Sequence, residues 1–188
     1  MVTIGPSGPS ALKEMVVKKL QKNEGFTLIE LLIVVAIIGI IAAIAVPGLL
    51  RARMSGNETS AIGSERAINS AEVSYSAAAG QGGYAASLAR LQIPCAGGTQ
   101  GFLSPDLSLD PSLKSGFTVS LIADPAAVPG PNDCNGVATT TNYYSEAEPI
   151  NFGSTGNRSF NTNAAGTIFA IPAATIAAGD QIAANAIQ

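Results

Sequence analysis

The longest uninterrupted apolar stretch of the chain lies near its N-terminus. From Leu31 to Leu50 the sequence reads LLIVVAIIGIIAAIAVPGLL, without a charged residue. As an α-helix this stretch would extend about 30 Å, since each residue adds roughly 1.5 Å, and that length matches the hydrocarbon core of a bilayer. Basic side chains favour the cytoplasmic side of a membrane, so lysines before the stretch predict a cytoplasmic N-terminus, although arginines also follow it (Lys18, Lys19, Lys22, Arg51 and Arg53).

Three residues interrupt the character of this segment. Glu30 places a carboxylate at its start, where a charge in lipid is costly, and no cation stands next to it in the sequence. Glu30 therefore predicts a partner supplied from elsewhere. Gly39 and Pro47 each weaken a helix, glycine through backbone entropy and proline through its missing donor and its clash with the preceding turn. They predict a kink or a local loss of helical order, and a kink without a function is the alternative.

A second helical segment runs from Leu49 to about Ala78, and two series of residues recur in it at seven-residue intervals. One series is apolar and predicts a stripe along the helix, and the other is acidic and predicts a line beside that stripe. We favour a solvated edge of an amphipathic helix for the acidic line, and the alternative is a surface that meets arginines of another subunit. The apolar series is Met54, Ala61, Ile68 and Tyr75, the acidic series is Glu58, Glu65 and Glu72, and the arginines are Arg51 and Arg53.

The remainder of the chain changes from a helical to a strand pattern. A loop region begins at Gly80 and reaches Pro111. Beyond it, aromatic and β-branched residues gather in short runs between turns rich in Pro, Gly and Asn, which predicts a small antiparallel sheet packed on the helix, and thus an α+β fold. From Ala173 onward an Ala-rich tail is expected to be loosely attached. The predicted strands are 117–122, 142–147, 158–162 and 167–171, the last two paired across 163–166.

The residue types argue against catalysis. The chain has no histidine, no Ser/His or Cys/His pair, no phosphate-binding glycine motif and no cluster with metal-ligand spacing. We therefore expect a protein that is not an enzyme and that carries no metal or cofactor. Asp106 with Asp110, or Asp124 with Asp133, could be imagined around calcium, but aspartate in such loops is more often a turn former.

The residues from Lys18 to Leu32, KKLQKNEGFTLIELL, closely resemble the prepilin signal of type IV pilins and type II secretion pseudopilins. The resemblance covers about residues 15–55. It implies that a prepilin peptidase cuts between Gly25 and Phe26 on the cytoplasmic face and methylates the new amino group of Phe26. Glycine suits such a cut, because a missing side chain lets the backbone enter a narrow site.

The same resemblance assigns roles inside the apolar segment. Glu30 would pair with the N-terminal ammonium of a neighbouring subunit during filament growth, which supplies the missing cation. Gly39 and Pro47 match the stretch where the helix of related filaments can lose order. The implied organisation is a leader (1–25), a transmembrane and polymerisation helix (26–50), an amphipathic continuation (51–79) and a globular antiparallel β domain with an Ala-rich tail (80–188).

The function implied by this family is that of a structural subunit of a type IV pilus-like filament, a homo-polymer. Its implied partners are the prepilin peptidase, an inner-membrane assembly platform and, before assembly, the lipid bilayer. The precursor would lie in a bacterial inner membrane, and the filament would be periplasmic or extracellular. Two alternatives stay open: a major pseudopilin of a type II secretion system, and a monomeric binding protein that is membrane-anchored or is released by an ordinary signal peptidase after Ala43-Ile44-Ala45.

Charge and cysteine content refine this picture. The chain has a net charge of -3, and loss of residues 1–25 would remove four lysines and two glutamates, so the mature chain would be clearly acidic. An acidic surface disfavours nucleic acid as the main ligand. Cys95 and Cys134 both follow the apolar segment, so export to an oxidising compartment would favour a disulfide between them, and two buried free thiols are the alternative.

Overall fold

The computed structural model describes residues 25–176 and 185–187, and it divides into two compact units that meet in sequence between Val46 and Pro47. The first unit consists of the start of a long helix, α2 (Leu28–Ala78). The second, called the head domain below, comprises the rest of α2 and all the other described elements. The predicted leader, residues 1–25, lies outside the described residues except for Gly25.

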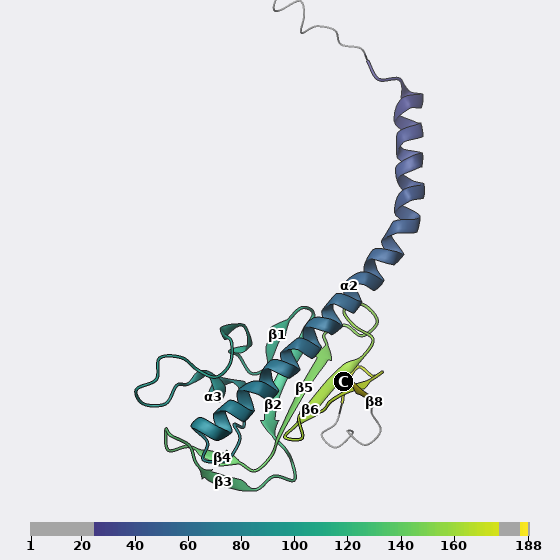
Figure 1. The fold of residues 1–188 in the computed structure, drawn as a ribbon. Coiled ribbons are helices and arrows are strands. Elements are labelled where there is room, and N and C mark those ends of the chain that lie inside the picture. The colour runs from purple at the N-terminus through teal and green to yellow at the C-terminus, as the bar shows by residue number, and fades with distance from the viewer. Residues whose placement is uncertain (1–24, 177–184, 188) are drawn as a thin grey trace, which may run out of the picture. The chain divides into compact units, whose positions relative to one another are not determined.

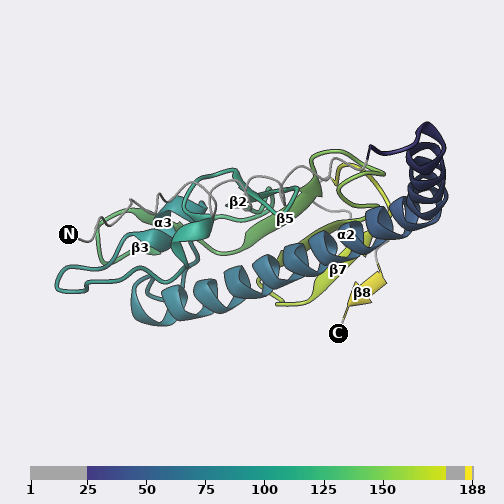
Figure 2. The ribbon, with the colours of Figure 1, turned by 90° about the horizontal axis from the view of Figure 1, so that it is seen from above.

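The head domain has one main sheet of six antiparallel strands with the order β1-β2-β5-β6-β7-β8. Within the head domain, α2 lies along one face of this sheet (Figures 1 and 2). Helix and sheet form the layers of an α+β fold, as predicted. The strands of the sheet are β1 (Ser112–Lys114), β2 (Phe117–Ala123), β5 (Tyr143–Pro149), β6 (Ser159–Asn163), β7 (Ile168–Ile171) and β8 (Asn185–Ile187).

Smaller elements occupy the segments between α2 and the sheet and between β2 and β5. The region predicted as loop from Gly80 to Pro111 contains a one-turn helix and a short 3₁₀ helix. Elements this short give too few residues for a periodic pattern to predict them. A separate two-stranded sheet follows β2. These elements are α3 (Leu88–Gln92), η1 (Pro105–Leu107), β3 (Pro129–Asn132) and β4 (Ala138–Thr140).

The four predicted strands are confirmed to within about two residues at each boundary, and β6 pairs with β7 across the predicted turn. The expectation of a loosely attached tail is wrong for the described part of it. The carbonyl oxygen of Ala173 accepts a hydrogen bond from Ser159, and Ile176 is buried and donates its N–H to Glu148. Further on, β8 completes one edge of the sheet. The small Ala side chains concealed these backbone contacts from the sequence pattern.

The core lies between α2 and the sheet. Ala61, Ile68 and Tyr75, three members of the predicted apolar stripe, are buried on the helix side. Phe117 and Phe160 are fully buried on the sheet side, with ring centroids 6.0 Å apart. Burying aromatic rings and branched aliphatic chains at roughly 25 cal/mol per Å² supplies the main driving force for this contact.

A disulfide closes the loop region onto the small sheet. Cys95 and Cys134 are bonded, with their Cα atoms 5.6 Å apart across a sequence separation of 39 residues. The predicted pairing is therefore confirmed. Because the bond joins residues so far apart in sequence, it restricts the unfolded chain strongly.

The residue beside the disulfide is a hub of hydrogen bonds. Asp133 is buried and accepts the Tyr75 hydroxyl at 2.7 Å, and it forms a salt bridge with Arg90 of α3. Its other oxygen accepts the N–H groups of Asn135 and Val137, both at 2.9 Å. One carboxylate thus joins α2, α3 and the disulfide loop, and it is satisfied on both oxygens.

We expect the double variant Cys95→Ser/Cys134→Ser to lower the free energy of unfolding by about 4 kcal/mol, because a closed loop of this length is released in the unfolded chain. The measurement is denaturant unfolding of the full chain in detergent micelles, with and without reductant. Reductant should shift the midpoint of the wild type toward that of the variant and leave the variant unchanged. An equal midpoint for reduced and oxidised wild type would contradict the prediction.

Candidate functional site

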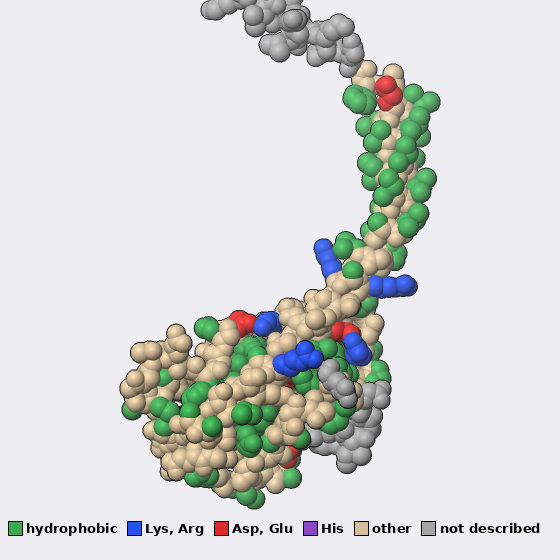
Figure 3. All heavy atoms as spheres, in the orientation of Figure 1, with side chains coloured by type: hydrophobic (Ala, Val, Ile, Leu, Met, Phe, Trp, Pro, Cys, Tyr) green, Lys and Arg blue, Asp and Glu red, His purple; other side chains and the backbone are tan. Residues whose placement is uncertain are grey.

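The first part of α2 has no protein cover. Every described side chain from Leu28 to Leu50 is exposed. Figure 3 shows hydrophobic side chains over the visible surface of this part of the helix. Among the described residues α2 alone has the length and composition to cross a membrane, with a mean hydropathy of 3.1 in its most apolar window. So large an apolar surface requires lipid or other protein around it.

The helix begins with a reciprocal cap made by Thr27 and Glu30. The Thr27 N–H and hydroxyl both donate to one carboxylate oxygen of Glu30, at 2.8 and 2.6 Å. In return, the Glu30 N–H donates to the Thr27 hydroxyl oxygen at 3.3 Å. This is a capping box, in which two otherwise unpaired N–H groups at a helix start are satisfied by side chains.

The cap gives Glu30 a partner within its own chain, while pairing with a neighbouring subunit stays a prediction. Glu30 was expected to need an external partner, and in the single chain its described hydrogen bonds go to Thr27 instead. No cation among the described residues pairs with it. The pattern Thr-x-x-Glu before an apolar run is the sequence signal for such a cap, and it predicts an internal partner for Glu30.

The other predicted residues of this segment are placed as follows. Phe26 precedes the helix, and its side chain is 80% exposed. Gly25 is likewise exposed and non-helical, so both residues of the predicted cleavage bond lie outside α2. Gly39 and Pro47 both lie inside α2, which is continuous through them. Cleavage, methylation and helix softening at these positions stay predictions.

The acidic series of α2 does not form a solvated edge, and it is not available to another subunit's arginines. Glu58 is buried and forms a salt bridge with Arg158 of its own chain at 2.7 Å, and it also accepts the Asn157 N–H at 2.8 Å. Glu65 and Glu72 are each 0% exposed. Both interpretations of the acidic line were therefore wrong.

The spacing of the two series explains the error. Taken together, their members are separated by three and four residues in turn, which is the spacing of one helix face. That face packs on the sheet. A glutamate side chain is usually exposed to water, but these glutamates lie on the helix face that is buried against the sheet. The combined series is Glu58, Ala61, Glu65, Ile68, Glu72 and Tyr75.

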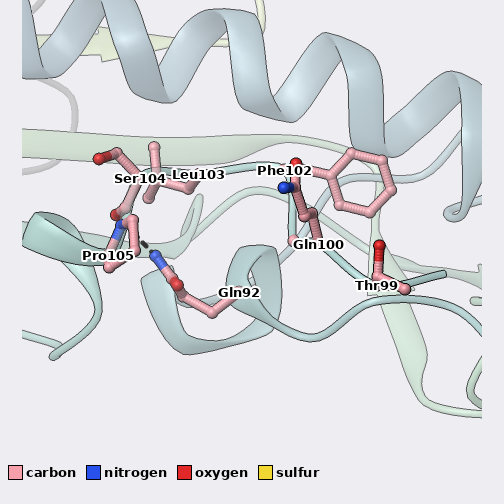
Figure 4. A pocket seen from close by; sticks show the side chains of 8 residues that line it. Gln92, Thr99, Gln100, Phe102, Leu103, Ser104 and Pro105 are labelled. Carbon is pink, nitrogen blue, oxygen red and sulfur yellow. Dashed lines mark hydrogen bonds between the residues drawn. The ribbon is translucent and has the colours of Figure 1, made fainter.

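One surface cleft of the head domain lies between α3 and the segment that follows the disulfide (Figure 4). It has a volume of about 520 Å³ and is lined by side chains that carry no charge. Gln92 donates to the carbonyl oxygen of Ser104 at 2.8 Å, and the Phe102 ring packs edge-on against Tyr75, 5.5 Å between centroids. Uncharged amides, hydroxyls and one ring give the cleft no group for acid-base or metal chemistry.

The four aspartates considered for calcium have structural roles in the loops. Asp106 pairs with Lys114 at 2.5 Å, and this interaction lowers the pKa of the Asp106 carboxyl. Asp110 accepts backbone N–H groups of α3 and β2, and Asp124 accepts the N–H two residues ahead, as a turn former does. Asp133 is the hub described above. Among the described residues, no three acidic, cysteine or histidine side chains gather as metal ligands would.

The segment that carries the cap and the exposed helix matches a known family. Residues 20–46 match the prokaryotic N-terminal methylation motif. The N-terminal segment of this chain is therefore similar to that of type IV pilins. No solved structure matches the chain.

Two curated proteins are similar to the chain over short stretches. The type IV major pilin protein PilA of Myxococcus xanthus is 46% identical over 54 residues, which make up 29% of this chain and 24% of that protein. The type IV wide pilus major component PilA4 of Thermus thermophilus is 58% identical over 40 residues, 21% of this chain and 30% of that protein. The chain thus matches less than a third of the length of each relative.

Replacing Thr27 should test the cap. We expect Thr27→Val to unwind the start of α2, because the variant lacks the hydroxyl that both donates to Glu30 and accepts from its N–H. Amide hydrogen exchange of residues 28–31 in detergent micelles should become several-fold faster. Thr27→Ser keeps the hydroxyl and serves as the control, with exchange close to wild type. Equal protection in the Val variant would show that the cap does not hold the helix start.

Proposed function

We propose that this protein is the structural subunit of a type IV pilus-like filament, made as a precursor in the inner membrane and polymerised through the first part of α2. The match of residues 20–46 to the N-terminal methylation motif carries the proposal. Both named relatives are pilus components, which favours a pilus over a secretion pseudopilus. The uncovered apolar surface of α2 gives a physical reason for assembly, because copies packed side by side would cover it outside the membrane.

In this proposal the apolar helix has two successive environments. Before assembly, lipid covers the exposed side chains, and the capping box satisfies the Thr27 and Glu30 groups that would otherwise be unpaired in lipid. In the filament, equivalent helices replace the lipid. Head-to-tail contacts between identical subunits do not close, and they therefore generate a helical polymer.

Processing by a prepilin peptidase would create the charge that assembly uses. Cleavage after Gly25 leaves an ammonium on Phe26, and that group would be methylated. The ammonium of one subunit would then approach the Glu30 carboxylate of its neighbour in a medium of low dielectric constant, where an opposite charge attracts strongly and an unpaired one is penalised. This pairing would set the axial register of each new subunit.

The processing step is tested by intact-mass and N-terminal analysis of the protein recovered from its native cell. We expect a chain that begins at N-methylated Phe26. The same analysis of a Gly25→Glu variant should find the uncut precursor, because a bulky charged side chain would occupy the cleavage position. A wild-type chain that begins after Ala45, or that retains Met1, would instead indicate a secreted or anchored monomer.

The assembly step is tested at Glu30 with two variants. Glu30→Ala removes both the cap and the charge, whereas Glu30→Gln keeps an oxygen that can accept from Thr27 and removes only the charge. We expect both variants to be cut and to accumulate in the membrane, with near-complete loss of filaments in shearing assays. Normal filaments from Glu30→Gln would show that capping suffices, and normal filaments from Glu30→Ala would remove the charge-pairing mechanism.

A further inference from the structure

Two carboxyl groups are buried where α2 meets the sheet, and most of their oxygens lack a partner. Glu65 and Glu72 are 0% exposed. Neither oxygen of Glu65 accepts a hydrogen bond, and neither does one oxygen of Glu72. The remaining Glu72 oxygen accepts the Ala85 N–H at 2.9 Å. Buried polar groups are almost always hydrogen-bonded, so orphaned carboxylate oxygens at this interface require an explanation.

The groups that face these carboxyls offer no positive charge. From β5, Ser145 lies near Glu65, but its hydroxyl donates to the Ser120 carbonyl oxygen at 3.1 Å. Glu146 of the same strand adds a second negative group. Tyr143 of β5 faces both glutamates, and its own pKa is raised, so that its hydroxyl stays neutral. The surroundings of Glu65 are thus neutral or acidic.

The surroundings of Glu72 are similar, and no described cation of the head domain forms an ion pair with Glu65 or Glu72. Tyr75 faces Glu72 from the next turn of α2, and burial raises its pKa. The Ala85 N–H from the loop after α2 is the one described donor. Arg51, Arg53 and Arg66 lie at exposed positions of α2. Three other cations have acidic partners: Arg90 with Asp133, Arg158 with Glu58, and Lys114 with Asp106.

Protonation of Glu65 and Glu72 would make their burial without a cation tolerable. An ionised carboxylate without a cation or donors is strongly disfavoured in a protein interior, whereas a neutral carboxyl is tolerated. Burial raises the pKa of Glu65 to about 8, opposed by Ser145 and reinforced by the negative charge of Glu146. Burial likewise raises the pKa of Glu72 to about 8, opposed by the Ala85 N–H.

We propose that Glu65 and Glu72 form a proton-linked latch between α2 and the sheet, in which the neutral carboxyls permit docking of α2 and loss of their protons loosens it. The latch is independent of the pilus function proposed above, since it depends on contacts inside one head domain. Both residues lie on the helix face that supplies Ala61, Ile68 and Tyr75 to the core. Loosening at this face would therefore weaken the whole helix-sheet contact.

The direction of the pH dependence follows from proton binding. The folded chain holds protons that the unfolded chain releases near the ordinary glutamate pKa of 4.5, so the head domain loses stability as pH rises from about 4.5 through about 8. Each group increases the unfolding constant by up to about tenfold per pH unit in that window. Above the folded pKa the dependence levels off.

The test measures the unfolding constant of the full chain in detergent micelles between pH 5.5 and 9.5, a range that spans the raised pKa of about 8. Unfolding in denaturant is followed by tyrosine fluorescence, because the chain has no tryptophan. We expect the constant to rise by at least tenfold per unit up to about pH 8. Glu65→Gln and Glu72→Gln should each reduce the rise of the unfolding constant by a factor of up to about ten per pH unit. The double variant should remove most of the pH dependence.

Matched controls separate the latch from general charge effects. Glu58→Gln removes the third member of the acidic series, whose carboxylate is paired with Arg158, and it should keep the wild-type slope. Glu146→Gln checks the neighbouring carboxyl on β5, whose pKa is raised by burial, and it should reduce the slope less than Glu65→Gln does. Glu65→Gln and Glu72→Gln profiles as steep as that of the wild type would overturn the proposal.

A second readout needs no variant and applies even where a glutamine variant fails to fold. The infrared carbonyl band of protonated carboxyl groups should be present in the wild type at pH 6.5 and should disappear between pH 7 and 9.5. Amide hydrogen exchange in residues 61–75 should become faster over the same range. A wild-type spectrum without that band at pH 6.5 would show that both groups are ionised in the folded chain, and it would end the latch hypothesis.

Discussion

The docking of α2 onto the antiparallel sheet is the contact on which the head domain depends. A sheet of this size must bury one face against another layer, and in this chain α2 is the layer available for that face. Phe117 and Phe160 on the sheet belong to the same buried cluster as Ile68 and Tyr75 on the helix. The hub at Asp133 and the disulfide then attach the loop region to the end of that same helix. The loop region is thus held to the same helix that covers the sheet.

The same helix imposes a different constraint in its first part. Helices in water are stabilised chiefly by tertiary packing of one face, and from Leu28 to Leu50 α2 has no such packing among the described residues. Lipid or neighbouring copies must supply it. In the proposed function this segment lies first in a bilayer and then in a bundle of equivalent helices. Both environments require that the segment be uniformly apolar and that its few polar groups find partners close by in the sequence. The Thr27–Glu30 cap meets the second requirement in the single chain.

The sequence predicted those parts of the structure that depend on local pattern. The strands β2, β5, β6 and β7 were recognisable because aromatic and β-branched residues are concentrated between clear turns. By contrast, β1 and β8 are three residues long and carry no such pattern. The salt bridge of Glu58 with Arg158 joins residues 100 positions apart, so nothing local announced it. The disulfide was predictable because the chain offers two cysteines, both beyond the apolar segment.

The burial of Glu58, Glu65 and Glu72 shows that residue type alone does not predict which face of α2 is exposed. At Glu58 a guanidinium and a backbone N–H meet the carboxylate, so a charge there is compatible with docking. At Glu72 one N–H remains, and at Glu65 neither oxygen has a partner, because the nearby Ser145 hydroxyl donates to the Ser120 carbonyl oxygen. Glu65 also lies between Ala61 and Ile68, in the middle of the docked face. A carboxyl in that position loses its proton in the docked state only well above the ordinary glutamate pKa, so in the proposed latch ionisation and loosening of the helix-sheet contact favour each other.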